Sequence, residues 1–147
     1  MGNMYKKTFP LASVDDNDSI RRGALDWLNT CPLKPMEAKL ILGKTSGFII
    51  SSIQGAVKTK EYIYGGYLGQ YQFDIVYRLI APHTEDILAA DDLLDKIGKW
   101  METNVPACPP WVNWWRIKRD TLADFAAAYD NNAEDHTIRM TITYEVI

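Results

Sequence analysis

The residues best suited to chemistry in this sequence are two cysteines and two histidines, and none stands near another. Zinc ligands usually recur in pairs about two to four positions apart. No such pair occurs among Cys31, Cys108, His83 and His136. We therefore predict that the protein binds no metal and no cofactor. Because nothing in the sequence indicates an oxidising compartment, we expect both thiols to be free.

No local pattern points to catalysis. A nucleophilic cysteine needs a base that a third group holds beside it, and neither cysteine lies in such a signature. Residues 42–45 resemble the end of a phosphate-binding loop, but Ala38 stands where that loop requires its first glycine. Asp91, Asp92 and Asp95 could form a carboxylate cluster for metal or acid–base work, although the solvated face of a helix is the favoured interpretation. The sequence thus predicts that the protein is not an enzyme.

Aromatic side chains form two groups that could contact a partner. One group flanks Gly65-Gly66, which is typical of a tight hairpin turn, and the other accompanies a run of prolines. Aromatic rings bury a large area with little loss of entropy, so both groups are candidate contact regions. For the tryptophans, packing in the core at the start of a strand is the favoured alternative. The candidate interaction residues are Tyr62, Tyr64, Tyr67, Trp111, Trp114 and Trp115.

Two amphipathic helices are expected to help position these groups. Residues 1–17 are predicted to be irregular, and the acidic run that ends at Asp18 can cap the first helix, which stops before Pro32. The second helix is predicted to start with Thr84 as its N-cap. On its outer face we expect two ion pairs, Asp92 with Lys96 and Asp95 with Lys99. The apolar stripes are Ile20, Ala24, Trp27 and Leu28, and then Ile87, Ala90, Leu94, Ile97 and Met101.

Much of the remaining sequence has the patterns of β-strands. Apolar and polar side chains alternate most clearly along the last predicted strand, which indicates one face against a core. Residues 121–129 fit a helix or a strand by periodicity, and residues 130–135 have the composition of a loop. The predicted strands cover residues 38–42, 48–51, 57–64, 71–79 and 137–146.

Length and composition indicate one domain over residues 1–147. The chain carries a formal net charge of −3 and is 47% hydrophobic, which suits a globular core and argues against a dedicated nucleic-acid binder. No stretch approaches the roughly 20 apolar residues that span a bilayer, and no apolar segment follows the basic pair near the start. We expect a soluble α+β protein with an antiparallel sheet and about two helices packed on one of its faces.

Four segments resemble one known family. They are Lys60-Glu61-Tyr62-Ile63-Tyr64-Gly65-Gly66, residues 69–78, residues 89–102, and the closing strand at residues 137–144. Their order and spacing are similar to the minor capsid or tail-terminator (tail-completion) proteins of long-tailed bacteriophages and prophages. The resemblance covers residues 56–147 and includes no catalytic signature. In that family the segment that corresponds to residues 121–129 is extended, so we predict a strand there.

The resemblance implies a structural protein of the virion tail or neck, made in the cytoplasm of the bacterial host. Such subunits form a ring, commonly of six copies, that caps the tail tube, stops its growth and meets the head connector. The implied partners are therefore other copies of the chain, the tail-tube protein and a connector or neck protein, with no membrane. A ring of net-negative subunits would let DNA pass through without binding it, because phosphate binding depends on cationic groups.

Two alternatives remain open at this point. A neighbouring neck, head-closure or minor capsid protein would share the same partners but occupy another position in the particle. A small enzyme or ligand-binding module would use the tryptophans with His83 or Cys108 and requires a pocket that holds shifted ionisable groups.

Overall fold

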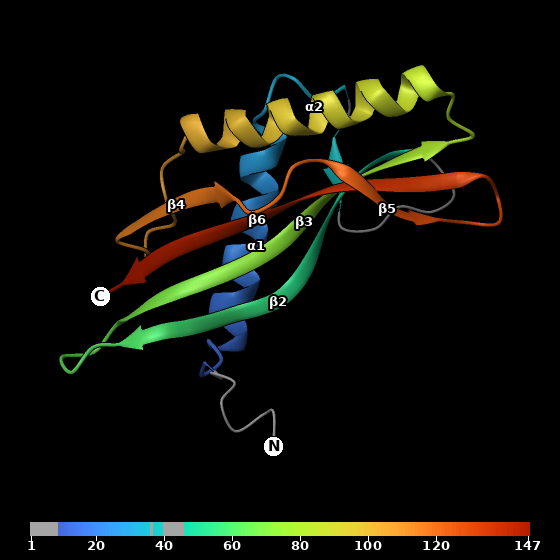
Figure 1. The fold of residues 1–147 in the computed structure, drawn as a ribbon. Helices are drawn as coiled ribbons and strands as arrows, with labels where there is room; N and C mark the ends of the chain where they lie inside the picture. The colour runs from blue at the N-terminus through green and yellow to red at the C-terminus, as the bar shows by residue number, and fades with distance from the viewer. Residues whose placement is uncertain (1–8, 36, 40–45) are drawn as a thin grey trace.

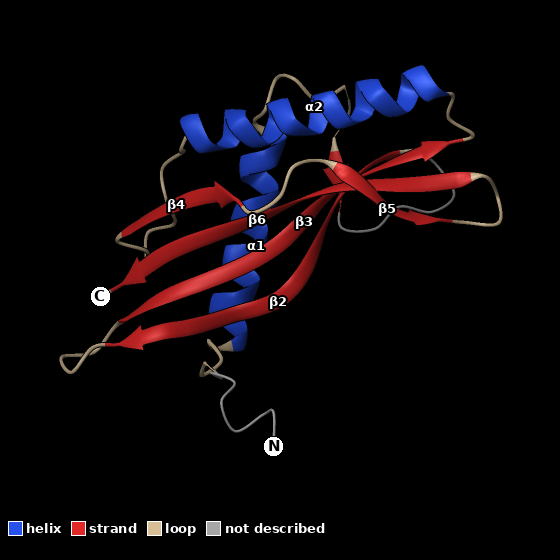
Figure 2. Ribbon diagram, viewed as in Figure 1, coloured by secondary structure: helices blue, strands red, loops and turns tan. Residues whose placement is uncertain are grey.

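The computed structural model describes residues 9–35, 37–39 and 46–147. The loop-like residues 42–45 and most of the strand predicted at residues 38–42 lie outside them. Within the described part, two helices pack against one sheet (Figures 1 and 2). The elements are α1 (Val14–Asn29), β1 (Ala38–Lys39), β2 (Gly47–Glu61), β3 (Tyr67–Ile80), α2 (Thr84–Thr103), β4 (Trp114–Arg119), β5 (Asp124–Ala128) and β6 (Ala133–Val146).

The sheet is built on the long strands β2, β3 and β6. Its order is β1-β2-β3-β6-β4. Strand β5 also pairs with β6, on the same edge as β4 but along the other half of that edge. Every strand pairing in the described residues is antiparallel except the short pairing of β1 with β2. The α+β class and the mainly antiparallel sheet predicted from the sequence are therefore confirmed.

Both helices cover the same face of the sheet. The alternation predicted for the closing strand is confirmed, because its inward side chains are fully buried against the helices. Trp27 of α1 and Ile97 of α2 belong to the same apolar core. The opposite face carries polar side chains of β3, β4 and β6, and no described element covers it (Figure 2). The inward residues of β6 are Ile138, Met140, Ile142 and Tyr144.

Helix α1 begins earlier than the sequence predicted. Its N-cap is Ser13, whose hydroxyl accepts a hydrogen bond from the backbone N–H of Asp16 at 3.0 Å. The prediction of an irregular segment through residue 17 is therefore wrong for residues 14–17, because a serine just before the acidic run caps the helix first. The predicted stripe is confirmed, since all four of its side chains are buried.

Helix α2 is capped by His83, one residue before the predicted Thr84. The Asp86 carboxylate reaches back and accepts a hydrogen bond from the backbone N–H of His83 at 2.9 Å. The predicted pair of Asp92 with Lys96 forms at 2.8 Å, whereas Asp95 accepts a hydrogen bond from the backbone of another segment. Neither described helix is long and apolar enough to cross a membrane.

Strands β2 and β3 form a hairpin at the predicted turn. The strands predicted at residues 48–51 and 57–64 are a single strand that ends at Glu61, and β3 begins at Tyr67, before the predicted start at residue 71. Gly65 and Gly66 adopt φ angles of 91° and 78°, which a residue with a side chain rarely adopts. At Gly66 there is also no space, because a Cβ would lie 2.3 Å from the carbonyl oxygen of Val146. The turn therefore depends on the absence of a side chain at this position.

The β5–β6 turn is tighter than the sequence indicated. Residues 121–129 contain strand β5, so the prediction of a strand there is confirmed. The loop predicted at residues 130–135 is wrong in its second half, because β6 already begins at Ala133. The backbone N–H of Tyr129 donates to Ala133, and Asn132 takes a positive φ of 63°. Asparagine tolerates this conformation, so a short turn suffices.

Candidate interaction site

Three of the six candidate aromatic residues pack inside the protein. Tyr67 is 6% exposed, and its hydroxyl donates a hydrogen bond to the Asp16 carboxylate at 2.5 Å. The Trp115 ring lies 4.8 Å from the Trp27 ring, between centroids. Trp111 is half-buried and donates to the Ser19 hydroxyl at 2.8 Å. These side chains join the sheet to α1, which leaves them unsuited to contact a partner.

The other three candidates lie together at one end of the sheet. The rings of Tyr62 and Tyr64 are stacked, with centroids 5.3 Å apart. The Tyr62 hydroxyl donates a hydrogen bond to Oε2 of Glu145 at 2.8 Å, and Trp114 stands opposite Glu145 in the β4–β6 ladder. Two regions that the sequence separates by about fifty positions therefore meet at one carboxylate. We call Tyr62, Ile63, Tyr64, Trp114 and Glu145 the tip cluster.

Glu145 braces the tip cluster from the last strand. Its Oε1 accepts a hydrogen bond from the Asn113 side chain at 2.8 Å, in addition to the bond from Tyr62. These two hydrogen bonds, the one from Asn113 first, lower the pKa of Glu145, and the Trp114 side chain adds to the effect. The same carboxylate raises the pKa of Tyr62 through their hydrogen bond. The interaction fixes the direction of the hairpin relative to β6.

The tip cluster exposes apolar surface at the turn. Ile63 is fully exposed, at 105% of its reference area, and Tyr64 is 78% exposed. A hairpin turn usually carries polar residues, so an exposed Tyr-Ile-Tyr run is unexpected unless it serves a contact. Ile63 is absent from the set of candidates that the sequence suggested. The apolar run directly before Gly65-Gly66 is the signal that could have identified it.

Basic side chains border the tip cluster. The ammonium group of Lys60 lies 5.9 Å from the centre of the Tyr62 ring, and the Arg116 guanidinium lies 5.5 Å from that of Trp114. Both distances are within the range of cation–π attraction. The surface at this end of the molecule is therefore apolar at its tip and carries positive charge beside it.

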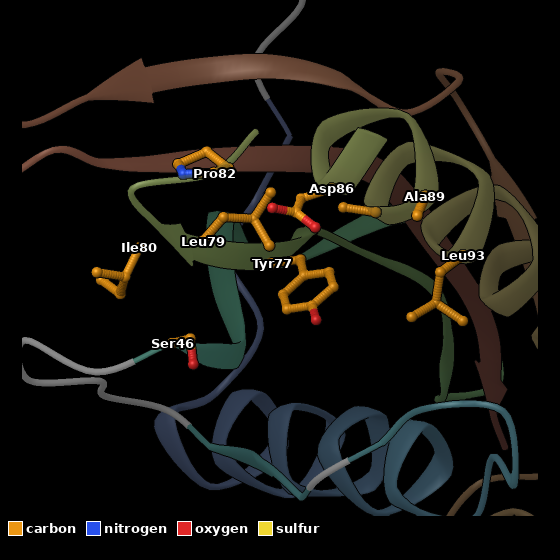
Figure 3. A pocket seen from close by; sticks show the side chains of 9 residues that line it. Ser46, Tyr77, Leu79, Ile80, Pro82, Asp86, Ala89 and Leu93 are labelled. Carbon is orange, nitrogen blue, oxygen red and sulfur yellow. The ribbon is translucent and has the colours of Figure 1, made fainter. Parts of the chain in front are cut away.

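A hollow of about 340 Å³ lies at the opposite end of β3. In Figure 3, Asp86, Ala89 and Leu93 of α2 face Tyr77 and Leu79 of β3 across it. Burial, and then the charge of Asp86, raise the pKa of Tyr77, so this phenol stays protonated and can donate. None of the residues proposed from the sequence as interaction sites lies here. The full lining is Ser46, Tyr77, Leu79, Ile80, Pro82, Asp86, Ala89, Ala90 and Leu93.

His136 lies in a closed cluster of carboxylates. Its side chain is 2% exposed, and its ring nitrogens lie 2.9 Å from Asp91 and 2.7 Å from Glu134. The ring of Phe125 packs edge-on against the imidazole, with centroids 5.9 Å apart. The cluster therefore has the geometry of a structural anchor that joins α2, β5 and β6.

The aspartates of α2 are only partly the solvated face that the sequence favoured. Asp91 bonds to His136, and Asp95 accepts a hydrogen bond from the backbone N–H of Ala123 at 2.8 Å. Only Asp92 matches the prediction, in an exposed pair with Lys96. The interpretation fails for the other two because β6 and the residue just before β5 approach this side of the helix, which periodicity within the helix does not reveal.

The thiols and histidines that could do chemistry lie apart. Cys31 is buried, and the half-buried Cys108 donates to the carbonyl oxygen of Val112. Both cysteines are free, as the sequence predicted. Among the described residues, no thiol contacts a histidine, and no three histidine, cysteine or acidic side chains are arranged to hold a metal ion.

No protein-family model matches this chain, and no curated protein matches its sequence. The class of protein is defined by the fold of the described residues: an α+β domain whose sheet has one face covered by helices, one face that no described element covers, and an apolar hairpin tip.

Proposed function

We propose that this protein is a structural assembly protein of a long-tailed bacteriophage or prophage. More specifically, it acts as a tail terminator, which forms a ring on the end of the tail tube and joins the tube to the head connector. The proposal starts from the resemblance of residues 56–147 to that family. The observation that supports it best is the exposure of Ile63 and Tyr64 at the tip of a braced hairpin.

The hydrogen bonds to Glu145 support this role because assembly contacts favour surfaces that are already ordered. Binding costs free energy when loops and side chains must be immobilised. In the tip cluster, Glu145 accepts hydrogen bonds from Tyr62 and Asn113, and the two tyrosine rings stack. The apolar surface of Ile63 and Tyr64 is therefore presented on a supported hairpin, which suits repeated, specific contacts between subunits.

The face of the sheet that no described element covers, here called the bare face, is compatible with passage of DNA if it lines the ring. Three of its basic residues are matched with acids: Arg78 bonds to Asp135 at 2.8 Å, Arg139 bonds to Asp74 at 3.1 Å, and Lys118 lies 3.9 Å from Asp120. Between these pairs, glutamine and threonine side chains of β3 and β6 share the face with the exposed Arg116 of β4. A surface whose cations are mostly paired with acids offers little net attraction to phosphates.

Tail-tube assembly provides the direct test. We expect that adding the protein to growing tubes of its tail-tube protein halts elongation and leaves a density on one tube end in electron micrographs. Native mass spectrometry over a concentration series, with and without the tube protein, should then show a closed ring or a monomer that joins tubes. Tubes that grow to the same length with and without the protein would refute the terminator function.

A pair of variants controls for loss of fold. Ile63→Ser combined with Tyr64→Ser removes the exposed apolar tip and should abolish the effect on tube growth. Leu88→Ser is the matched control, because Leu88 is 65% exposed on α2 and lies outside the tip cluster. Equal loss of activity in both variants would mean that the tip cluster has no special part in assembly.

A further inference from the structure

The tip cluster and the hollow of Figure 3 lie at opposite ends of one strand. β3 begins at Tyr67, directly after the hairpin turn, and ends at Ile80, which lines the hollow. Its 14 residues span about 46 Å at the usual rise of a strand. Figure 1 shows the hairpin and the start of α2 at opposite ends of the sheet. The tip therefore cannot reach the hollow of its own chain.

The two surfaces are complementary in polarity. The hollow has apolar walls, formed by Leu79, Ile80, Pro82 and Leu93, and it contains the hydroxyl of Tyr77 and the carboxylate of Asp86. The tip offers an isoleucine side chain and a tyrosine, which combines an apolar ring with a hydroxyl. A tyrosine that enters such a hollow can bury its ring and still find a polar partner for its hydroxyl.

Their charges are complementary as well. Lys60 is exposed beside the tip cluster, and the first turn of α2 carries Glu85 and Asp86, of which Asp86 lines the hollow. Opposite charges across an interface favour the correct orientation and disfavour contacts between two like surfaces. A contact between the tips of two copies would bring their Lys60 side chains together, and a contact between two hollows would bring their carboxylates together. A contact between the tip of one copy and the hollow of another avoids both like-charge contacts.

We propose that the hairpin tip of one copy of this chain docks into the hollow between α2 and β3 of a second copy. Because each copy carries both surfaces, the contact is head-to-tail, and its repetition gives a ring if the rotation closes. The inference rests on the proposed assembly function, and it adds which surfaces meet. It assigns the hollow to Ile63 and Tyr64 of the neighbouring copy.

Cysteine cross-linking between two differently labelled copies tests the contact without any tube protein. One copy carries Ile63→Cys and the other carries Ala89→Cys at the hollow. Mixing them under mild oxidation should give a covalent dimer that contains one copy of each, with the linkage located by peptide mass mapping. The control replaces Ala89→Cys with Leu88→Cys, one residue away and outside the lining of the hollow. Equal cross-linking of both mixtures would overturn the proposal.

Filling the hollow provides a second, independent test. Ala89 is exposed at the hollow, so Ala89→Trp should fold while it occupies the space for the tip. We expect cross-linking of Ile63→Cys copies to Ala89→Cys copies to fall about tenfold or more when an excess of wild-type protein competes. It should be unaffected by an excess of protein that combines Ala89→Trp with Ile63→Ser and Tyr64→Ser, because that protein offers neither the hollow nor the tip. Equal competition by both proteins would overturn the proposal.

The outcome separates this inference from the terminator function. If wild-type protein caps tubes but the cross-link does not form selectively, the terminator function stands and the docking mode is wrong. If the cross-link forms selectively but tubes grow unchecked, the chain assembles head-to-tail in some other role.

Discussion

The Nδ1 atom of His136 lies 2.9 Å from Oδ1 of Asp91, so a buried histidine of β6 is bonded to a carboxylate of α2. Forty-five positions separate the two residues in the chain. The contact attaches the first half of α2 to the end of the sheet at which β5 joins β6. It also divides the aspartates of α2 into those with structural contacts and one that is solvated.

Replacing Asp91 should therefore cost more stability than replacing its neighbour. Asp91→Ala leaves the buried His136 without one of its partners, and we expect the free energy of unfolding to fall by about 1–3 kcal/mol. Asp92→Ala removes only an exposed pair with Lys96 and should cost less than about 0.5 kcal/mol. Urea denaturation of both variants checks this, and equal losses would contradict the anchoring role of Asp91.

The two adjacent tryptophans of β4 should differ in the same way. Trp115→Ala removes a ring that packs against Trp27 in the core, and we expect a loss of about 3–5 kcal/mol. Trp114 lies on the other face of the sheet, so Trp114→Ala should cost about 1 kcal/mol or less. The midpoints of denaturant unfolding provide the comparison. A larger loss for Trp114→Ala would show that the faces of β4 are assigned wrongly.

Gly69 provides a test of packing between β3 and β6. A Cβ at this position would lie 2.3 Å from the ring of Tyr144, which rests directly on the backbone. Gly69→Ala should therefore lower the free energy of unfolding by about 1–3 kcal/mol through overpacking. Gln70→Ala, on the bare face of the same strand, is the control and should change it by less than about 0.5 kcal/mol. A Gly69→Ala variant as stable as the wild type would exclude the close contact.

Stability should fall at alkaline pH because of three buried tyrosines. Burial is the main cause that raises the pKa of Tyr67, Tyr71 and Tyr144 in the folded protein. Above about pH 10, these phenols ionise in the unfolded chain but stay protonated in the fold. Their contribution is complete below that pH and is lost as the pH rises, because ionisation then favours unfolding.

Unfolding curves measured from neutral pH to above about pH 10 check this prediction. Absorbance of tyrosinate should rise in step with unfolding for these three residues. Tyr144→Phe cannot ionise at this position and should weaken the dependence on pH. A stability that stays constant through the alkaline range would contradict the burial of these hydroxyls.

Glu145 should respond to acid in the opposite direction. Hydrogen bonds from Asn113 and Tyr62 lower its pKa in the folded protein. The stabilisation from these bonds is therefore present above the ordinary pKa of a glutamate and is lost as the pH falls through the lowered value. We expect the carboxyl signal of Glu145 in an NMR titration to move to a higher midpoint in Asn113→Ala. An unchanged midpoint would show that Asn113 does not hold the carboxylate.

Several features of the fold follow from local patterns. Both helices were predictable, because their apolar stripes recur at the helical period and become the buried faces. The strand that ends with Tyr144 was predictable from alternation, and the hairpin turn from Gly65-Gly66. The cap at Ser13 and the early start of β6 were missed, because a nearby acidic or polar run gave a competing signal.

The sequence by itself determined which residues share a face, because periodicity is a local property of the backbone. It could not determine which faces meet. Tyr62 and Tyr67 belong to the same aromatic group, yet the first lies at the surface against Glu145 and the second is buried against Asp16. Only the pairing of β3 with β6 decided this, since it brings the last strand beside the hairpin. The tip cluster and the hollow likewise depend on contacts between distant segments, which no local pattern encodes.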